Sequence, residues 1–292
     1  MHGNHLEKMS RRITIITVCF NSAKTIQDTL ESVWRQSRVD ANGQAFEIEY
    51  IVVDGESKDN TVALIREFAE RVATGVGTKD FSFTWVSEKD NGLYDAMNKG
   101  IKMATGDIIG IVNSDDMLNS DNVLATVMSY FNGDIGVIYS DVRIVPAYAR
   151  LNEIDHIPSI RYIWPRFWRT WMLSWGWTPP HPGLFIKKSA YENCGGYLTG
   201  YEISSDDEII VRLVRRYGIR ARYLPICASA MRTGGKSQSG GIKTFIKQNK
   251  EFAEMNRANG YFCYLPMMFP KLVIKALEIA VPWIMNAFGK RI

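Results

Sequence analysis

The stretch Gly106-Asp107-Ile108-Ile109-Gly110-Ile111-Val112-Asn113-Ser114-Asp115-Asp116 decides the fold. A short apolar run that stops at two carboxylates is typical of a buried parallel strand, which delivers its last side chains to the ligand-binding edge of an open α/β sheet. Carboxylate pairs suit Mg²⁺ or Mn²⁺, which substrate phosphates then complete. Asp115 and Asp116 therefore indicate chemistry on a diphosphate. The alternative is a turn that caps a helix beginning near Ser120.

The composition is that of a globular protein whose positive charge lies near the C-terminus. Of the 292 residues, 46% are hydrophobic and 23% are charged, and the formal net charge is +4. These values are ordinary for a chain with a sizeable core. From residue 243 onward, eight basic residues stand against three acidic ones in an apolar context. A basic, apolar tail favours an anionic membrane surface as a partner and argues against nucleic acid.

Cysteine usage and the N-terminus indicate a cytoplasmic protein. The four cysteines have no Cys-x-x-Cys pair and no histidine at zinc-finger spacing, so we expect reduced, mostly buried thiols. Residues 1–12 are polar and lack the apolar core of a secretory signal.

Strand-like runs are followed by helical patterns three times, at 13–20 then 24–36, 46–53 then 57–72, and 81–86 then 93–104. This alternation predicts a mostly parallel sheet covered by helices on both faces. Polar residues stand where the strands end, at Asn21, Asp54, Asp90, Asp115 and Asp116. Because parallel strands end at one edge, these side chains predict a nucleotide cleft. No Gly-x-Gly-x-x-Gly follows the first strand, which argues against a dinucleotide-binding domain.

Four motifs, in order, carry a resemblance to a known family: Thr17-Val18-Cys19-Phe20-Asn21, Val53-Asp54-Gly55-Glu56-Ser57-Lys58-Asp59-Asn60-Thr61, Glu88-Lys89-Asp90-Asn91-Gly92-Leu93-Tyr94-Asp95-Ala96-Met97-Asn98-Lys99-Gly100 and Asn113-Ser114-Asp115-Asp116. Together they resemble the family 2 glycosyltransferases of bacterial polysaccharide assembly, over roughly residues 13–237. The resemblance implies an α/β protein of the GT-A (Rossmann-like) class, with a mostly parallel central sheet flanked by helices and a helical C-terminal extension. It also implies inverting sugar transfer from a nucleoside-diphosphate donor to a hydroxyl, assisted by Mg²⁺ or Mn²⁺.

Carried over by the resemblance, the nucleotide-sugar site comprises Thr17, Asn21, Asp54, Asp90, Asp95, Asn98 and Asp115. Asp116 is the expected metal ligand, and Asp115 assists it or contacts the ribose. Many family members have Asp where this chain has Asn113, so either Asn113 or Asp115 completes the metal site. The structural alternatives are a turn at Asp54, a helix-dipole role for Asp95 and a loop-pinning role for Asn98.

A fifth motif, Ser204-Ser205-Asp206-Asp207-Glu208, opens a helix. Ser205 and Glu208 have the spacing of a capping box, so the acidic residues have a structural alternative. Transfer needs a base on the acceptor hydroxyl, and in the family this base is the Asp six residues before an Arg. We therefore expect Asp206, which precedes Arg212 by six, to be the catalytic base, with Asp207 in reserve.

The segment from 161 to 177 holds five of the eight tryptophans, interleaved with arginines. Aromatic rings stack on sugars or lie at lipid headgroups, so we assign this segment, with Trp177, to the acceptor side. The alternative is a loop packed onto the sheet. His181 follows, where related transferases have a histidine, and is expected near donor phosphate, metal or acceptor, with a structural role as the alternative.

The segment Arg232-Thr233-Gly234-Gly235-Lys236-Ser237 ends like a P-loop but lacks the first glycine, and Ala230 stands in that place. We reject a P-loop and predict a loop that brings Lys236 near phosphate, with a solvated linker as the alternative.

Three regions follow: a polar tail (1–12), a glycosyltransferase domain (13–240, with halves 13–145 and 146–240) and a basic amphipathic extension (241–292). Charges and prolines make residues 264–288 unsuited to span a membrane. Lys271, Lys275 and Glu278 form one polar stripe, which predicts a helix lying in the membrane interface, anchored by Trp283 and Lys290-Arg291. The alternative is a helix docked on protein.

The sequence thus predicts a metal-dependent glycosyltransferase that acts on a glycan acceptor, polyprenyl-linked, in O-antigen, capsule or exopolysaccharide assembly. We expect it to be peripheral on the cytoplasmic face of the inner membrane, and a homo-oligomer is left open. There are two alternative functions. A sugar nucleotidyltransferase would need a Gly-rich loop, but residues 17–25 contain no glycine. The other is a non-catalytic glycan- or nucleotide-binding scaffold.

Overall fold

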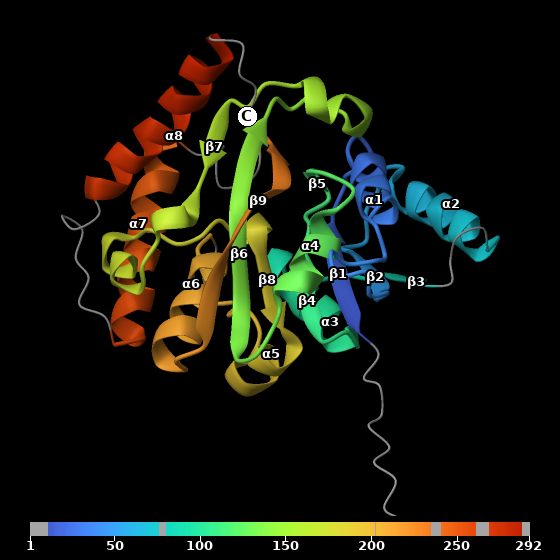
Figure 1. Cartoon of the computed structure of the whole chain (residues 1–292), viewed down its shortest axis with the longest axis horizontal. Helices are drawn as coiled ribbons and strands as arrows, with labels where there is room; N and C mark the ends of the chain where they lie inside the picture. Colours follow the sequence, from blue (N-terminus) through green and yellow to red (C-terminus); the bar gives the residue numbers. More distant parts are fainter. Residues whose placement is uncertain (1–10, 76–79, 202, 235–240, 261–268, 288–292) are drawn as a thin grey trace, which may run out of the picture.

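A computed structural model describes residues 11–75, 80–201, 203–234, 241–260 and 269–287. Its strands form one nine-stranded sheet within that part of the chain, in the order β3-β2-β1-β4-β8-β6-β9-β5, with β7 paired to β6 (Figure 1). Helices cover both faces of the sheet, as the alternating sequence pattern predicts.

The first half of the chain builds three strand–helix units and a fourth strand. In chain order the elements are β1 (Arg12–Cys19), α1 (Ile26–Trp34), β2 (Glu47–Asp54), α2 (Thr61–Ala73), β3 (Phe81–Ser87), α3 (Leu93–Met103), β4 (Ile108–Ile111), β5 (Asp116–Leu118) and α4 (Val123–Tyr130). β1 to β4 pair in parallel, with Cys19 opposite Asp54 and Asp54 opposite Ser87. The predicted common edge is therefore real, because these strands end side by side.

The second half completes the same sheet. Its elements are β6 (Ile135–Val145), η1 (Leu151–His156), β7 (Arg161–Ile163), η2 (Pro165–Phe167), η3 (Thr170–Trp175), η4 (His181–Gly183), β8 (Leu184–Lys187), α5 (Lys188–Cys194), α6 (Ser205–Val211), η5 (Arg212–Arg216) and β9 (Arg220–Arg232). β8 runs antiparallel to both β4 and β6, whereas β9 is parallel to β6 and antiparallel to β5.

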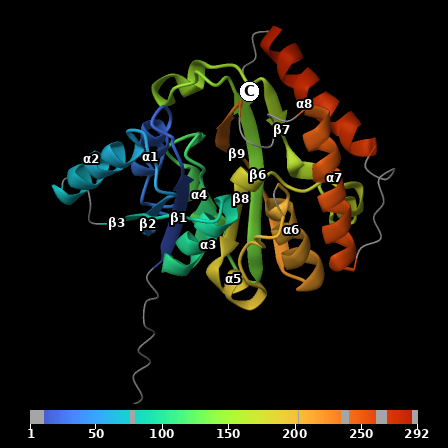
Figure 2. The ribbon, with the colours of Figure 1, turned by 180° about the vertical axis from the view of Figure 1, so that it is seen from behind.

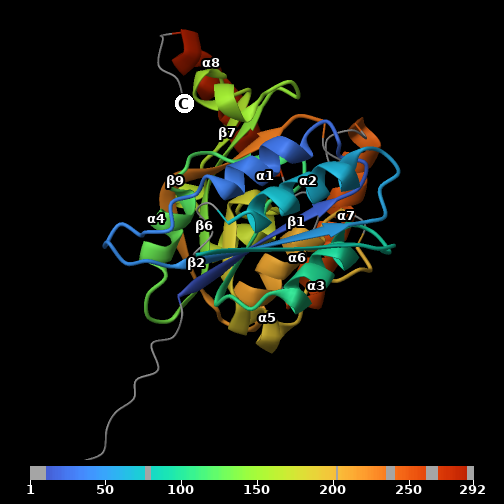
Figure 3. The ribbon, with the colours of Figure 1, turned by 90° about the vertical axis from the view of Figure 1, so that its right-hand side faces the viewer.

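Two apolar cores lie on opposite faces of the sheet (Figure 3). One core packs α1, α2 and α4 against β1, β2 and β6, with side chains such as Leu30 and Phe68 fully or nearly fully buried. The other packs α3, α5 and α6 against the opposite face and includes Met97 and Ile209. Because each helix shows one apolar face, it settles on the sheet with its polar face outward.

Two helices form the C-terminal extension beside the second core: α7 (Gly241–Ala258) and α8 (Phe269–Ala287). They lie next to each other at one end of the sheet (Figures 1 and 2). α7 packs on α6, and α8 packs on β7 and η3. Among the described helices, none combines the length and apolar character needed to cross a bilayer.

Candidate active site

The turn between β4 and β5 presents the predicted carboxylate pair at the common edge. Asp116 is 2% exposed, and its carboxylate accepts hydrogen bonds from the Arg232 backbone N–H (3.3 Å) and from Nδ2 of Asn113 (3.4 Å). Burial, followed by the neighbouring Asp115 carboxylate, raises the pKa of Asp116 well above its usual range. Burial also raises the pKa of Asp115, with Arg232 opposing the shift. At this pair, burial therefore outweighs the compensating positive charge of Arg232.

This arrangement fits a hard divalent cation. The Oδ1 atom of Asn113 is buried without a hydrogen-bond partner beside the two carboxylates, so a third oxygen ligand is at hand. Within the described ranges, no three His, Cys, Asp or Glu side chains gather closely enough to hold a metal alone. A small donor set is what Mg²⁺ and Mn²⁺ use when waters and substrate phosphates fill the remaining positions.

The sequence indicated Arg232 only as the start of a loop. In the structure, its side chain holds the turn between β4 and β5 in place. Arg232 ends β9, is 3% exposed, and pairs with Asp28 of α1 at 2.5 Å. Its guanidinium also donates to the carbonyl oxygens of Asp115 (2.8 Å) and Ala149 (2.9 Å). The loop pattern concealed this role, because the contacts join segments more than eighty residues apart.

At the end of β2, Asp54 is fully buried and organises the neighbouring loop. Its carboxylate accepts hydrogen bonds from the Ser57 backbone N–H (2.9 Å), the Ser57 hydroxyl (2.5 Å) and the Ser87 hydroxyl (2.7 Å). Gly55 follows, and a Cβ there would come within 2.5 Å of Oδ2 of Asp90. The glycine therefore lets Asp90, which follows β3, lie against the end of β2.

Thr17 and Asn21 lie on either side of the end of β1. Thr17 is fully buried, and its hydroxyl shares a 2.9 Å hydrogen bond with Tyr50 in the core. Asn21 is exposed, with a positive φ of 51°, and its Oδ1 accepts a hydrogen bond from the Lys58 backbone N–H (2.8 Å). Asn21 thus links the loops that follow β1 and β2, and Thr17 anchors the end of β1 in the core.

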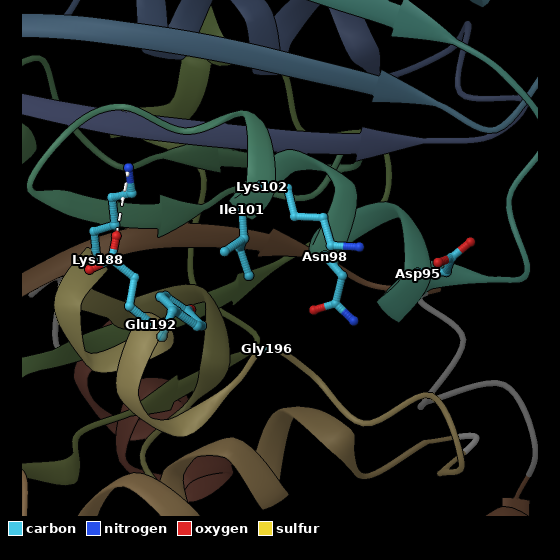
Figure 4. A pocket seen from close by; sticks show the side chains of 8 residues that line it. Asp95, Asn98, Ile101, Lys102, Lys188, Glu192 and Gly196 are labelled. Carbon is cyan, nitrogen blue, oxygen red and sulfur yellow. Dashed lines mark ion pairs between the residues drawn. The ribbon is translucent and has the colours of Figure 1, made fainter.

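Asp95 and Asn98 lie on α3, along a cavity of about 500 Å³ between α3 and α5 (Figure 4). Asp95 accepts a hydrogen bond from the Asn91 backbone N–H (3.0 Å). Asn98 makes two hydrogen bonds to the backbone of Tyr197, at 2.7 and 2.8 Å, so it does pin a loop. Asp115 and Asp116 are not among the residues that line this cavity.

The first turn of α6 carries Asp206 and Asp207. Oδ1 of Asp206 lies 3.2 Å from the hydroxyl of Tyr94, in the first turn of α3. Since α3 begins just after β3, this contact brings Asp206 to the edge at which the parallel strands end. Asp207 accepts a hydrogen bond from the hydroxyl of Thr178. Both carboxylates are half-buried, as expected for groups that reach both solvent and protein.

The capping box proposed as the structural alternative does not form. Glu208 is 1% exposed and instead pairs with Arg212 at 3.0 Å, one turn along the helix. The N–H groups of Ile203 and Ser204 donate to Oε2 of Glu251 on α7, each over 3.1 Å. A carboxylate from the C-terminal extension therefore caps this helix, a pairing that local spacing could not indicate.

His181 is buried near Asp207, and its Nε2 shares a 2.8 Å hydrogen bond with the hydroxyl of Tyr197. Burial lowers the pKa of His181 to about 4, against the opposing effect of Asp207. The carbonyl of the half-buried Trp177 accepts a hydrogen bond from Nε1 of Trp168 (3.0 Å).

The tryptophan segment is partly packed on the protein and partly exposed, and its acceptor-side role stays a prediction. Trp168 is buried and packs the loop onto the sheet, whereas Trp171 is half exposed. Lys236, expected near phosphate, lies outside the described residues.

Comparison with known proteins assigns the family. A sequence model of glycosyl transferase family 2 matches residues 14–189, more than half of the chain. The chain therefore belongs to glycosyl transferase family 2, and it is a glycosyltransferase. Two Mycobacterium tuberculosis proteins described as uncharacterized glycosyltransferases are each 30% identical over 203 residues, which is 68% of this chain and 68% of each relative.

A further relative, a PGL/p-HBAD biosynthesis glycosyltransferase of Mycobacterium bovis, is 24% identical over 80% of this chain and 82% of its own length. Among solved structures, a mannosyltransferase from Pyrobaculum calidifontis in complex with GDP-Man and Mn²⁺ has a TM-score of 0.58 at 20% identity, covering 96% of this chain and 76% of that one. S. aureus TarS 1–349 with UDP-GlcNAc has a TM-score of 0.60 at 15% identity, covering 85% and 65%. These likenesses confirm the predicted GT-A fold.

Proposed function

We propose that this glycosyltransferase moves a sugar from a nucleoside-diphosphate donor to a hydroxyl of a glycan acceptor, with inversion at the anomeric carbon. The observation that supports this most directly is the placement of two acidic groups at one edge of the sheet. Asp115 lies in the turn after β4 and Asp116 begins β5, and the contact with Tyr94 brings Asp206 to the same edge. Inverting transfer needs a charge-compensating site at the leaving diphosphate and a base opposite it.

The donor half of the site is formed by the loops after β1, β2 and β3. Asp54, Asp90 and Asn21 are the proposed contacts for the nucleotide, Thr17 supports them from the core, and Asp95 extends the site along α3. Asn98 is proposed to act on the site through the loop that it pins at Tyr197. Asp116, with Asp115 or Asn113, is the proposed metal site. A bound Mg²⁺ or Mn²⁺ supplies positive charge to the leaving diphosphate. The residue roles follow from position at the strand ends, where nucleotides bind in α/β sheets.

Asp206 is the proposed base. As the acceptor oxygen bonds to the anomeric carbon, its proton passes to the Asp206 carboxylate, and the electron pair of the broken C–O bond leaves with the diphosphate. Asp207, held by Thr178, remains in reserve. His181 has a lowered pKa and is neutral at pH 7, so we place it as a support or hydrogen-bonding group on the acceptor side with Trp177.

The acceptor is proposed to be lipid-linked because α8 turns apolar side chains to solvent while its Glu278 faces the protein. Glu278 is 2% exposed and accepts a 2.8 Å hydrogen bond from Nε of Arg161 on β7. The outward face carries six exposed apolar side chains: Leu272, Val273, Leu277, Ile279, Trp283 and Ile284. Such a face, in a net basic segment, suits the surface of an anionic bilayer on its cytoplasmic side. The helix is thus docked on protein by one side, and the other is free for lipid.

The proposal is tested by donor binding. We expect UDP-GlcNAc or GDP-mannose with Mn²⁺ to raise the melting temperature of the protein, since ligands that bind only the native state stabilise it. Chelator should abolish the shift, and Asp116→Asn should reduce it strongly. Asp121→Asn, an exposed residue of the loop before α4, is the matched control and should leave it unchanged. A non-catalytic scaffold protein would bind the donor but never hydrolyse it. A rise in melting temperature that persists in chelator would refute the metal site.

A further inference from the structure

Two acceptors share the hydroxyl group of Tyr94. The oxygen lies 2.7 Å from the carbonyl oxygen of Ile203 and 3.2 Å from Oδ1 of Asp206. Burial, followed by the nearby Asp206 and Asp207 carboxylates, raises the pKa of Tyr94, so the hydroxyl stays protonated and acts as a donor. A contact across 112 residues thus joins the first turn of α3 to the first turn of α6.

The ring of Tyr94 is held in place by its neighbours. It stacks on Tyr197 with centroids 5.9 Å apart and an interplanar angle of 19°. Asn98 fixes the backbone of Tyr197, and the Tyr197 hydroxyl bonds to His181 (2.8 Å) and Tyr191 (3.2 Å). Because its ring stacks on this network, Tyr94 holds its hydroxyl group in one position.

We propose that Tyr94 is a positioning residue for glycosyl transfer, which orients the carboxylate of Asp206 through its hydroxyl group. This rests on the proposed role of Asp206 as the base. A hydrogen bond to Oδ1 restricts the rotation of the carboxylate that receives the acceptor proton. Tyr94 keeps its own proton throughout, and as Asp206 becomes neutral the hydroxyl retains its shorter bond to Ile203.

The test compares Tyr94→Phe with Tyr223→Phe. Each variant loses one phenolic hydroxyl that donates to a carboxylate, but Tyr223 donates to Asp141 (2.7 Å) and Tyr94 to Asp206. Water serves as the acceptor, and the rates of hydrolysis of UDP-GlcNAc and GDP-mannose with Mn²⁺ are measured. We expect Tyr94→Phe to lower kcat about tenfold, a part of the ~10²–10⁴ supplied by a general base, with the KM for donor unchanged. Tyr223→Phe should change kcat less than about twofold.

Equal losses of kcat in the two variants, or a raised KM with kcat intact, would overturn the role of Tyr94. A second readout needs no turnover: Tyr94→Phe should lower the urea midpoint less in an Asp206→Ala background than in the wild type, because the two side chains interact. Equal effects in both backgrounds would also overturn it. Failure of the proposed function is distinct, since the wild type would then either bind no donor or bind it without hydrolysing it.

Discussion

Single buried side chains hold the loops of the site by bonding to backbone groups. Arg212 donates to the carbonyl oxygens of Cys194, Gly195 and Gly196, while Asn98 holds Tyr197 from the other side. The loop that precedes α6 is therefore held between α3 and η5. Leaving a buried carbonyl without its hydrogen-bond donor costs about 1–3 kcal/mol. Breaking these contacts is therefore unfavourable, and the loop is held in one conformation.

Gly196 is the position at which a larger side chain should disturb this loop most. A Cβ at this position would lie 2.2 Å from Oδ1 of Asn98, whereas a Cβ at Gly200 would meet nothing within 4 Å. We expect Gly196→Ala to lower the free energy of unfolding by about 1–3 kcal/mol, because the Asn98 side chain must move away from Tyr197. Urea unfolding measures this. Gly200→Ala is the control, and equal losses in the two variants would contradict the role of Asn98.

The sequence predicted residues whose signal is local and missed those defined by distant partners. Asp115 and Asp116 follow an apolar strand, and that pattern places them at the edge without further information. Arg232 bonds to Asp28 and to Asp115 only because β9 lies beside β5 in the sheet. No local spacing encodes such a pairing.

The start of α6 depends on contacts from the C-terminal extension. α6 has no side-chain cap of its own, and the Glu251 carboxylate of α7 accepts the N–H groups of Ile203 and Ser204 instead. Asn259 at the end of α7 also donates to Glu208 over 3.3 Å. α7 is thereby part of the active-site scaffold, since it sets where the first turn of α6 begins.

Glu251→Ala tests this dependence. We expect a loss of about 0.5–2 kcal/mol in the free energy of unfolding, the range of a lost helix cap, together with reduced donor turnover. Glu254→Ala removes an exposed carboxylate on the same helix and should change neither quantity. Urea unfolding and donor hydrolysis are the measurements. A fully stable, fully active Glu251→Ala protein would show that α7 does not position α6.

The elements that the sequence predicts are those with a regular spacing of apolar residues. β1 to β4 and α1 to α3 show apolar runs or helical spacing, and their observed bounds differ by only a few residues from those predicted. β9 was missed, because Arg220 and Arg222 at its start, Pro225 within it and a half-exposed surface obscure the strand pattern. β5 has only three residues, too few for any period to appear.

At the scale of the whole molecule, one sheet joins both halves of the domain, and the extension closes one end of it. β8 lies between β4 of the first half and β6 of the second, so donor and acceptor sides share a rigid frame. α8 is attached to this frame by Glu278 and Arg161 and turns an apolar face away from it. The frame and the outward face together suit an enzyme that works at a surface.

Vesicle binding tests the outward face of α8. Leu277→Ser with Trp283→Ser should reduce binding to phosphatidylglycerol vesicles at least tenfold, because each apolar side chain contributes about 1.5–3 kcal/mol when fully buried. Binding should weaken with added salt. Leu198→Ser removes an exposed apolar side chain elsewhere and should have no effect. Undiminished vesicle binding by the double variant would assign the face to another partner.

The most direct test of the central claim is the rate of donor turnover by Asp206→Asn, measured beside its affinity for the donor. The account predicts that UDP-GlcNAc or GDP-mannose with Mn²⁺ binds the variant as it binds the wild type, while turnover falls by about 10²–10⁴, the contribution of a general base. Turnover near the wild-type rate would contradict the account, because the carboxylate that faces Tyr94 would then not be the base.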